Sequence, residues 1–349
     1  MVSIIRALAG EPSIPVGFPI LFDADMAIIE PAFLWLMEHA ELSGRAQATE
    51  TVRTYGEHLH DWFDSLEQSG IEWREADERV IATYRSFGSV GAPAAIMDAL
   101  PKLEMIGLFS VGYDKVDVDH ARSKGIRVTN TPDVLTDDVA DLAVGLLYAT
   151  VRNIAANDRL VRPGGWARGE KPALAGRVTG ATIGILGLGR IGRAIAKRLE
   201  PVAGEILYHN RKPAADTAYR YVADAIDFAR QSEVVIVATS GGPEAAKLVD
   251  GAMLDALGPD GVIVNISRGG VIDETAMVER LADRRIAGAG LDVFAHEPHV
   301  PEALFAMDHV VLQPHQGSAT VHTRKAMADL VVANLDAWFG GEALLTPVV

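Results

Sequence analysis

The sequence contains no cysteine among its 349 residues. Disulfide bonds, thiolate zinc sites and cysteine nucleophiles are therefore excluded. Long apolar runs are also missing, since none reaches the roughly 18 residues that a membrane helix needs. The start of the chain is a poor signal peptide because Glu11 and Pro12 interrupt its apolar stretch early. These absences together favour a cytoplasmic protein whose chemistry uses neither thiols nor a membrane.

Positive charge is the next shortage. The chain has 32 Lys and Arg against 47 Asp and Glu, a formal net charge of -15, and its basic residues form no long run. Such a chain repels nucleic-acid phosphates and anionic membrane surfaces. No set of His, Asp and Glu has a spacing typical of metal ligands, so we expect no metal. The charge therefore disfavours nucleic acid and membranes as partners.

The spacing of the apolar residues differs between two parts of the chain. From Pro31 to Tyr84 they recur at spacings of three and four, which predicts helices. From Leu103 onward, short and nearly continuous apolar runs alternate with helical stretches, and residues 136–162 read as one long helix. Alternation of this kind predicts an α/β fold with a parallel sheet covered on both faces. The sequence therefore predicts a helical N-terminal segment over residues 1–87, followed by an α/β protein.

A glycine pattern follows one of the predicted strands. Gly187, Gly189 and Gly192 form G-x-G-x-x-G within ILGLGRIGRAIAKRL, at the passage from a strand into a helix. In this setting the glycines permit a tight turn, a close approach of a pyrophosphate, and close packing of helix on strand. The alternative is an ordinary tight turn. We expect dinucleotide binding by the whole turn, which comprises Gly187, Leu188, Gly189, Arg190, Ile191 and Gly192.

The end of the next predicted strand bears on which dinucleotide is bound. NAD-binding domains usually place an acidic residue there for the ribose 2′-hydroxyl. This chain has Asn210, Arg211 and Lys212 instead. A guanidinium pairs well with a 2′-phosphate, which a carboxylate would repel. We therefore expect NADP to be preferred, with NAD possible. The alternative is a solvated basic turn.

Three later strands end in side chains that suit the reduction of a keto acid. VNISRGGVIDE ends its strand at Arg268, AGLDVFAHEP leads to Glu297, and VVLQPHQGSAT leads to His315. Because the carboxyl ends of parallel strands share one edge of a sheet, these groups should face the bound dinucleotide. An arginine can bind a substrate carboxylate and polarise a keto oxygen, and a histidine held by a carboxylate can donate the proton.

These motifs resemble the D-isomer-specific 2-hydroxyacid dehydrogenases, in the glyoxylate/hydroxypyruvate reductase branch. The resemblance covers about residues 88–349 and includes YHNRKP and GSVGAPAAIMDALPKLE. It implies a Rossmann-type doubly wound sheet, a smaller flavodoxin-like substrate domain, and a homodimer. It implies Arg268, Glu297 and His315 as catalytic residues. The further cofactor-binding residues that it implies are Thr239, Ser267, Asp292 and Gly317, and the substrate-binding residues are Ser89, Val90, Gly91, Val111, Gly112 and Arg268.

The first 87 residues do not fit that family, because the opening strands of its substrate domain are missing. They resemble the N-terminal helical core-binding domain of tyrosine recombinases, through ATETVRTYGEHLHDWFDSLEQSGIEWREADERVIATYRSF. We therefore predict three parts. They are the helical segment 1–87, an apparently truncated substrate domain of residues 88–152 and 319–349, and an NAD(P)-binding domain of residues 153–318.

Three functions remain open from the sequence. The first is the reduction of glyoxylate or hydroxypyruvate to the D-2-hydroxy acid with NADPH. The second is NADP(H) binding with little turnover, as in a sensor or corepressor-like module, if the altered substrate domain is inactive. The third is DNA binding through residues 1–87, against which the acidic balance of that segment argues.

Overall fold

The computed structural model describes residues 3–6, 19–22, 92–98, 100 and 103–349. Contacts between Cα atoms divide the chain into two units, residues 1–85 with 100–105, and residues 86–99 with 106–349. In the first unit, β1 (Ser3–Arg6) and β2 (Pro19–Phe22) pair antiparallel. The predicted helical segment 1–87 is wrong at these two stretches, where β-branched isoleucines favour a strand. Residues 31–84, which carry the helical pattern, lie outside the described residues.

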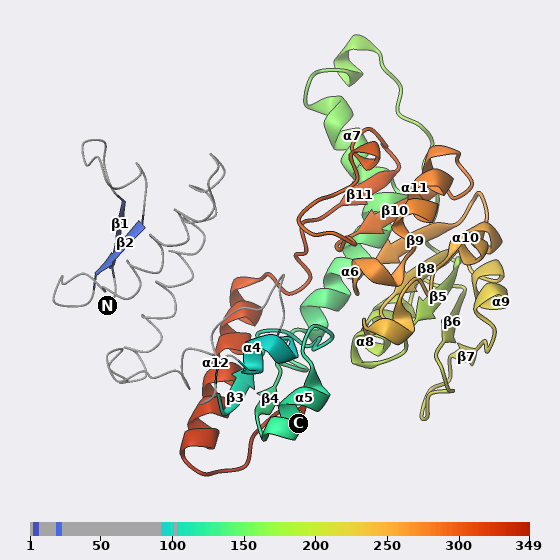
Figure 1. Cartoon of the computed structure of the whole chain (residues 1–349). Coiled ribbons are helices and arrows are strands. Elements are labelled where there is room, and N and C mark those ends of the chain that lie inside the picture. The colour runs from blue at the N-terminus through green and yellow to red at the C-terminus, as the bar shows by residue number, and fades with distance from the viewer. Residues whose placement is uncertain (1–2, 7–18, 23–91, 99, 101–102) are drawn as a thin grey trace. The chain divides into compact units, whose positions relative to one another are not determined.

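A parallel sheet of seven strands is the centre of the second unit (Figure 1). Its order is β11-β10-β9-β8-β5-β6-β7, and every neighbouring pair is parallel. The strands are β5 (Thr182–Leu186), β6 (Glu205–His209), β7 (Arg220–Tyr221), β8 (Val234–Val237), β9 (Val262–Asn265), β10 (Gly288–Leu291) and β11 (Val310–Leu312). The predicted doubly wound α/β fold is confirmed. The strand order reverses at β5, which pairs with β6 on one side and β8 on the other.

Helices cover both faces of this sheet, which is why the strands are apolar almost without interruption. On one face, α6 (Thr136–Val151) and α8 (Arg190–Leu199) pack on Ile183 and Ile185 of β5. On the other face, Val235 and Val237 of β8 pack with the remaining crossover helices. Those helices are α9 (Ala225–Arg230), α10 (Gly251–Leu257) and α11 (Glu274–Ala282).

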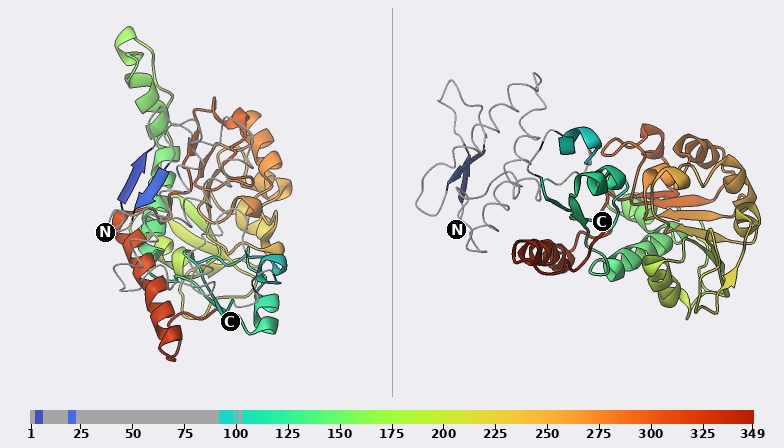
Figure 2. Two further views of the ribbon diagram at one scale, coloured as in Figure 1. Left: turned by 60° about the vertical axis from the view of Figure 1, so that its left-hand side comes forward. Right: turned by 60° about the horizontal axis from the view of Figure 1, so that its bottom comes forward.

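The predicted long helix over residues 136–162 is wrong at Asn153. There the backbone takes a φ of 52°, in the left-handed region that asparagine tolerates, and the helix breaks. α6 therefore ends at Val151, and α7 (Ile154–Val161) leaves it at an angle of 62°. α7 extends away from the sheet in Figure 1 and in the left view of Figure 2. In the described part of the chain no single helix is long and apolar enough to cross a membrane, although α6 and α7 together meet that test by length and composition.

The C-terminus returns to a group of short elements outside the large sheet. These are α4 (Ala94–Asp98), β3 (Met105–Gly107), α5 (Val118–Lys124) and β4 (Arg127–Thr129), with the long α12 (Val321–Phe339). β3 and β4 form a two-stranded sheet. Asn334 of α12 accepts hydrogen bonds from the Leu345 and Thr346 amides at 3.0 and 3.1 Å, and the Thr346 hydroxyl donates to the Asn130 carbonyl. The chain end is thereby tied to β4.

Candidate active site

The predicted site residues of the large sheet gather at one edge, because each follows the carboxyl end of a parallel strand. In the order of the strands along that edge, they are His315 after β11, Asp292 after β10, Ser267 and Arg268 after β9, Thr239 after β8, Gly187 after β5, and Asn210 after β6.

The glycine turn has two crowded positions and one open position. Gly187 has a φ of 102°, and a Cβ there would lie 2.6 Å from the Thr239 nitrogen. A Cβ on Gly192 would lie 2.1 Å from the Gly187 oxygen, so helix α8 packs directly on the turn. A Cβ on Gly189 would meet nothing within 4 Å, which leaves open space before the first turn of α8. These residues fit a dinucleotide, whose pyrophosphate binds the free amides of a helix N-terminus.

Side chains around the turn fix its position. Asn210 accepts a hydrogen bond from the Leu188 amide at 2.7 Å, so it braces the turn. Arg190 at the start of α8 pairs with Asp133 at 3.0 Å, and both side chains are exposed. Leu188 is buried, and Ile191 packs on the core beneath α8.

The basic residues after β6 lie at the surface. Arg211 forms an ion pair with Glu244, which belongs to the short helix η2 (Pro243–Ala245) after β8. Both side chains are largely exposed, and Lys212 is exposed as well. The position expected to meet a 2′-phosphate therefore carries two cations, one of which already has a carboxylate partner.

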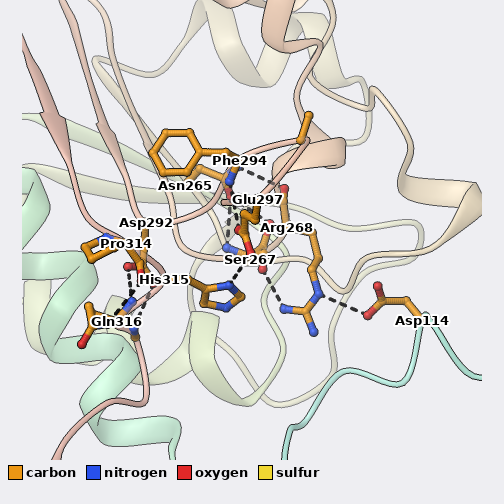
Figure 3. A network of polar contacts seen from close by, with 12 residues as sticks. Asp114, Asn265, Ser267, Arg268, Asp292, Phe294, Glu297, Pro314, His315 and Gln316 are labelled. Carbon is orange, nitrogen blue, oxygen red and sulfur yellow. Dashed lines mark hydrogen bonds and ion pairs between the residues drawn. The ribbon is translucent and has the colours of Figure 1, made fainter. Parts of the chain in front are cut away.

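His315 and Glu297 form a close pair (Figure 3). The Nδ1 atom of His315 lies 2.8 Å from Oε2 of Glu297. The other carboxylate oxygen accepts a hydrogen bond from the Phe294 amide at 3.1 Å. Because Nδ1 is engaged by Glu297, Nε2 on the other side of the ring is the nitrogen left for a substrate.

The loop that carries His315 is held by Asp292. His315 has a φ of 53°, and its amide donates to the Asp292 carbonyl at 2.9 Å. The carboxylate of Asp292, 1% exposed, accepts from the amides of Gln316 at 2.6 Å and Gly317 at 2.9 Å. Burial raises the pKa of Asp292, against the opposing effect of those two amides. Both oxygens of Asp292 thus support the conformation that presents the imidazole.

Arg268 is held from two sides. Its Nη1 donates to the Ser267 carbonyl at 2.9 Å, and its Nε donates to Oδ1 of Asp114 at 3.2 Å. Ser267 is itself fixed, because its amide and its hydroxyl both donate to the side chain of Asn265 at 3.0 Å. Asp114 reaches Arg268 from the loop between β3 and α5, as Figure 3 shows.

Charge in the site keeps Glu297 ionised. Its burial acts to raise the pKa, but the hydrogen bond with His315, the Phe294 amide, and the positive charges of His315 and Arg268 outweigh burial, and the pKa of Glu297 lies below its usual value. The Glu297 carboxylate therefore accepts at Nδ1 of His315 in its charged form. One edge of the sheet therefore combines a fixed cation, an imidazole with an ionised partner, and a glycine turn able to bind phosphate.

Comparison with known proteins shows the family of this chain. Residues 144–317 match the model of the D-isomer specific 2-hydroxyacid dehydrogenase NAD binding domain. The chain is 51% identical over 261 residues to the glyoxylate/hydroxypyruvate reductase A of Arabidopsis thaliana, covering 75% of this chain and 83% of the relative. The chain belongs to the D-isomer specific 2-hydroxyacid dehydrogenase family. A hydroxyphenylpyruvate reductase of Plectranthus scutellarioides is equally similar, at 51% identity over the same shares.

A solved structure agrees with the assignment of this dehydrogenase. The NADPH-dependent glyoxylate/hydroxypyruvate reductase of Sinorhizobium meliloti, in complex with NADP and malonate, is 48% identical with a TM-score of 0.71. The match covers 74% of this chain and 82% of that protein. The likeness of residues 1–87 to a recombinase domain stays a prediction.

The predicted substrate residues of the dehydrogenase are only partly described. Ser89, Val90 and Gly91 lie outside the described residues. Val111 and Gly112 lie in the loop between β3 and α5, where the Val111 carbonyl accepts from Asn130 at 2.8 Å. Gly112 is next to Arg268, since a Cβ on Gly112 would lie 1.9 Å from the Nη2 atom.

Sequence reasoning missed three residues of this site. Gly241 and Glu244 follow β8 at the same edge as the predicted residues, so the rule that ligands bind beyond the carboxyl ends of parallel strands covers SGGPE as well. Asp114 carried no such signal, because it lies 154 positions before Arg268. Its role depends on a contact that only the folded chain creates.

Proposed function

We propose that this dehydrogenase reduces a small 2-keto acid, glyoxylate or hydroxypyruvate, to the D-2-hydroxy acid, with NADPH as the preferred cofactor and NADH as a possible one. The observation that carries the proposal is the hydrogen bond between ionised Glu297 and Nδ1 of His315. This pair lies at the same sheet edge as Arg268 and the glycine turn. The names of similar proteins from Arabidopsis thaliana and Sinorhizobium meliloti support the substrate class and the cofactor.

The residues of the chain divide the work as follows. The chemistry that reduced NADP supplies, when bound, is a hydride for the carbonyl carbon of the keto acid. Arg268 binds the substrate carboxylate and stabilises negative charge on the keto oxygen. Nε2–H of His315 donates its proton to that oxygen, and in the reverse direction Nε2 accepts it. Glu297 orients the ring through Nδ1.

The cofactor is held by the turn and the residues around it. The amides at the start of α8 bind the pyrophosphate, next to the open space at Gly189. Arg211 and Lys212 bind the 2′-phosphate, which is the basis for a preference for NADPH. Thr239, Ser267, Asp292 and Gly317 complete this side of the site, as the family resemblance implies.

The test is the consumption of NADPH, followed by its absorbance, with glyoxylate and with hydroxypyruvate, and NADH in parallel. We expect turnover that prefers NADPH and falls at least about a hundredfold in His315→Ala, since a positioned general acid contributes about that much. Exposed His322 provides the control, His322→Ala. Unchanged turnover in His315→Ala would contradict the assignment. Tight NADPH binding without consumption would favour a cofactor-binding protein instead.

We also propose a homodimer in which the arm formed by residues 154–175 takes part. The arm begins with α7, includes exposed Trp166 (68%) and Leu174 (100%), and ends where the Gly176 amide donates to the Val151 carbonyl. Large exposed apolar side chains so placed favour a protein interface. Light scattering should report a dimer that Trp166→Glu weakens, and a monomeric wild type would contradict the proposal.

We also propose a cytoplasmic location and no nucleic-acid partner, in keeping with the net charge of -15.

A further inference from the structure

Arg268 has more hydrogen-bond donors than its two protein partners use. A guanidinium has five N–H groups in one plane. In this structure Nε–H goes to Asp114 and one Nη1–H goes to the Ser267 carbonyl. The second Nη1–H and both hydrogens of Nη2 have no hydrogen-bond partner among the described residues. A carboxylate binds best across two parallel N–H groups, so the orientation of the plane decides whether those hydrogens meet a substrate as a pair.

Asp114 is placed to set that orientation. Its side chain is 19% exposed and the side chain of Arg268 is 33% exposed, so solvent reaches both only in part. The Ser267 contact comes from the neighbouring residue and moves with the backbone of Arg268 itself. Asp114 is an independent contact, from a loop 154 positions earlier in the chain. It is therefore the contact that fixes the guanidinium relative to the loop at Val111 and Gly112.

Two glycines make room for the guanidinium in this orientation. A Cβ on Gly112 would lie 1.9 Å from Nη2 of Arg268, and a Cβ on Gly241 would lie 2.7 Å from its Cγ. The same Cβ on Gly241 would lie 3.4 Å from the carboxyl carbon of Asp114. The Arg268 side chain thus packs against the backbone of Gly112 and of Gly241, and its Nε donates to Asp114.

We propose that Asp114 is a positioning residue for Arg268, which holds the guanidinium so that Nη1 and Nη2 present paired hydrogens to the carboxylate of the 2-keto acid. The inference rests on the proposed function of Arg268 as the carboxylate-binding group. Asp114 acts as a hydrogen-bond acceptor, since its negative charge by itself opposes the binding of an anionic substrate. Replacing the charge while keeping the acceptor should therefore leave substrate binding intact.

The experiment compares Asp114→Ala, Asp114→Asn and a control, Asp119→Ala. Asp119 is an exposed carboxylate on α5 that pairs only with Arg122 in the described part of the chain, so its removal changes the net charge equally. KM and kcat are measured with glyoxylate, the Kd of oxamate is measured in the presence of NADPH, and the Kd of NADPH and the melting temperature are measured for each variant. Oxamate probes the carboxylate site without turnover.

We expect Asp114→Ala to raise the KM of glyoxylate and the Kd of oxamate about tenfold, which is typical of losing a hydrogen bond to a charged group. The Kd of NADPH and the melting temperature should stay at their wild-type values. Asp114→Asn should bind oxamate as well as the wild type or better, because Oδ1 still accepts from Nε. Asp119→Ala should match the wild type throughout.

Three results would overturn the inference. Wild-type oxamate binding in Asp114→Ala would show that Asp114 does not orient Arg268. Equal damage in Asp114→Asn and Asp114→Ala would show that the charge matters rather than the acceptor. Failure of the wild type to bind oxamate would show that Arg268 does not form a carboxylate-binding site. If the wild type binds oxamate but reduces no keto acid, the proposed function fails, and the oxamate values alone decide the role of Asp114.

Discussion

His315 and Arg268, the two residues proposed for catalysis, are held in different ways. His315 is fixed by residues near it in sequence, since Asp292 and Glu297 lie 23 and 18 positions before it on the same side of the large sheet. Arg268 is fixed in part by Asp114, from the loop between β3 and α5. The proposed proton donor is therefore held within the large sheet, whereas the proposed carboxylate-binding group also depends on the loop between β3 and α5.

Removing the local support of His315 should produce the largest effect. Glu297→Gln keeps the size of the side chain but removes the carboxylate charge beside Nδ1 of His315. We expect kcat to fall about a hundredfold with little change in the KM of glyoxylate, because general acid catalysis supplies about that factor. Steady-state kinetics separate the two constants. A rise in KM alone would contradict the assignment of Glu297 to His315.

Crowding Arg268 at Gly112 should produce the next effect. A Cβ on Gly112 would lie 1.9 Å from Nη2 of Arg268 and 2.8 Å from Oδ1 of Asp114, both at the ends of side chains, so Gly112→Ala should displace the guanidinium without unfolding the chain. We expect kcat/KM for glyoxylate to fall about tenfold, through lost hydrogen bonds to the substrate, at an unchanged melting temperature. Gly270→Ala is the matched control, because a Cβ there meets nothing within 4 Å. A fall in melting temperature comparable to that of a core mutant would assign Gly112 to the fold instead.

A smaller effect is expected at the 2′-phosphate position. Glu244 pairs with Arg211, so it should compete with the phosphate of NADPH that Arg211 is proposed to bind. Exposed ion pairs contribute at most about 1 kcal/mol, so Glu244→Gln should tighten NADPH binding by about threefold and leave NADH binding unchanged. Fluorescence titration measures both, and Glu342→Gln, on an exposed residue after α12, controls for net charge. Equal changes for the two cofactors would show that Glu244 does not compete for the phosphate.

The smallest expected effect is on stability at acid pH. Because the pKa of Glu297 is lowered in the folded protein, its pairing stabilises the fold above the ordinary glutamate pKa of about 4.3, and that contribution is lost as pH falls through the lowered value. The melting temperature of the wild type should exceed that of Glu297→Gln at neutral pH, and the two should converge as the pH falls below that range. If the two melting temperatures instead moved apart as the pH falls, Glu297 would not stabilise the fold through a lowered pKa.

The same contrast explains what the sequence could predict. The turn at Gly187, the parallel sheet, and the strand ends at Arg268 and His315 follow from local patterns and from the geometry of parallel sheets. Asp114 could not be found in this way, because it meets Arg268 only in the folded chain. The break at Asn153 was not predicted because a single left-handed residue interrupts an otherwise helical pattern. β1 and β2 were not predicted because the helical pattern of residues 31–84 was extended to the start of the chain.

The most direct test of this account is a double-mutant comparison of kcat/KM for glyoxylate with NADPH. If Asp114 acts through Arg268, adding Asp114→Ala to Arg268→Ala should cause no further loss, whereas adding it to Glu297→Gln should multiply the two separate losses. If Asp114→Ala lowers the activity of Arg268→Ala by the same factor as that of the wild type, the two residues act independently, and the proposed dependence of the carboxylate-binding group on the loop between β3 and α5 is wrong.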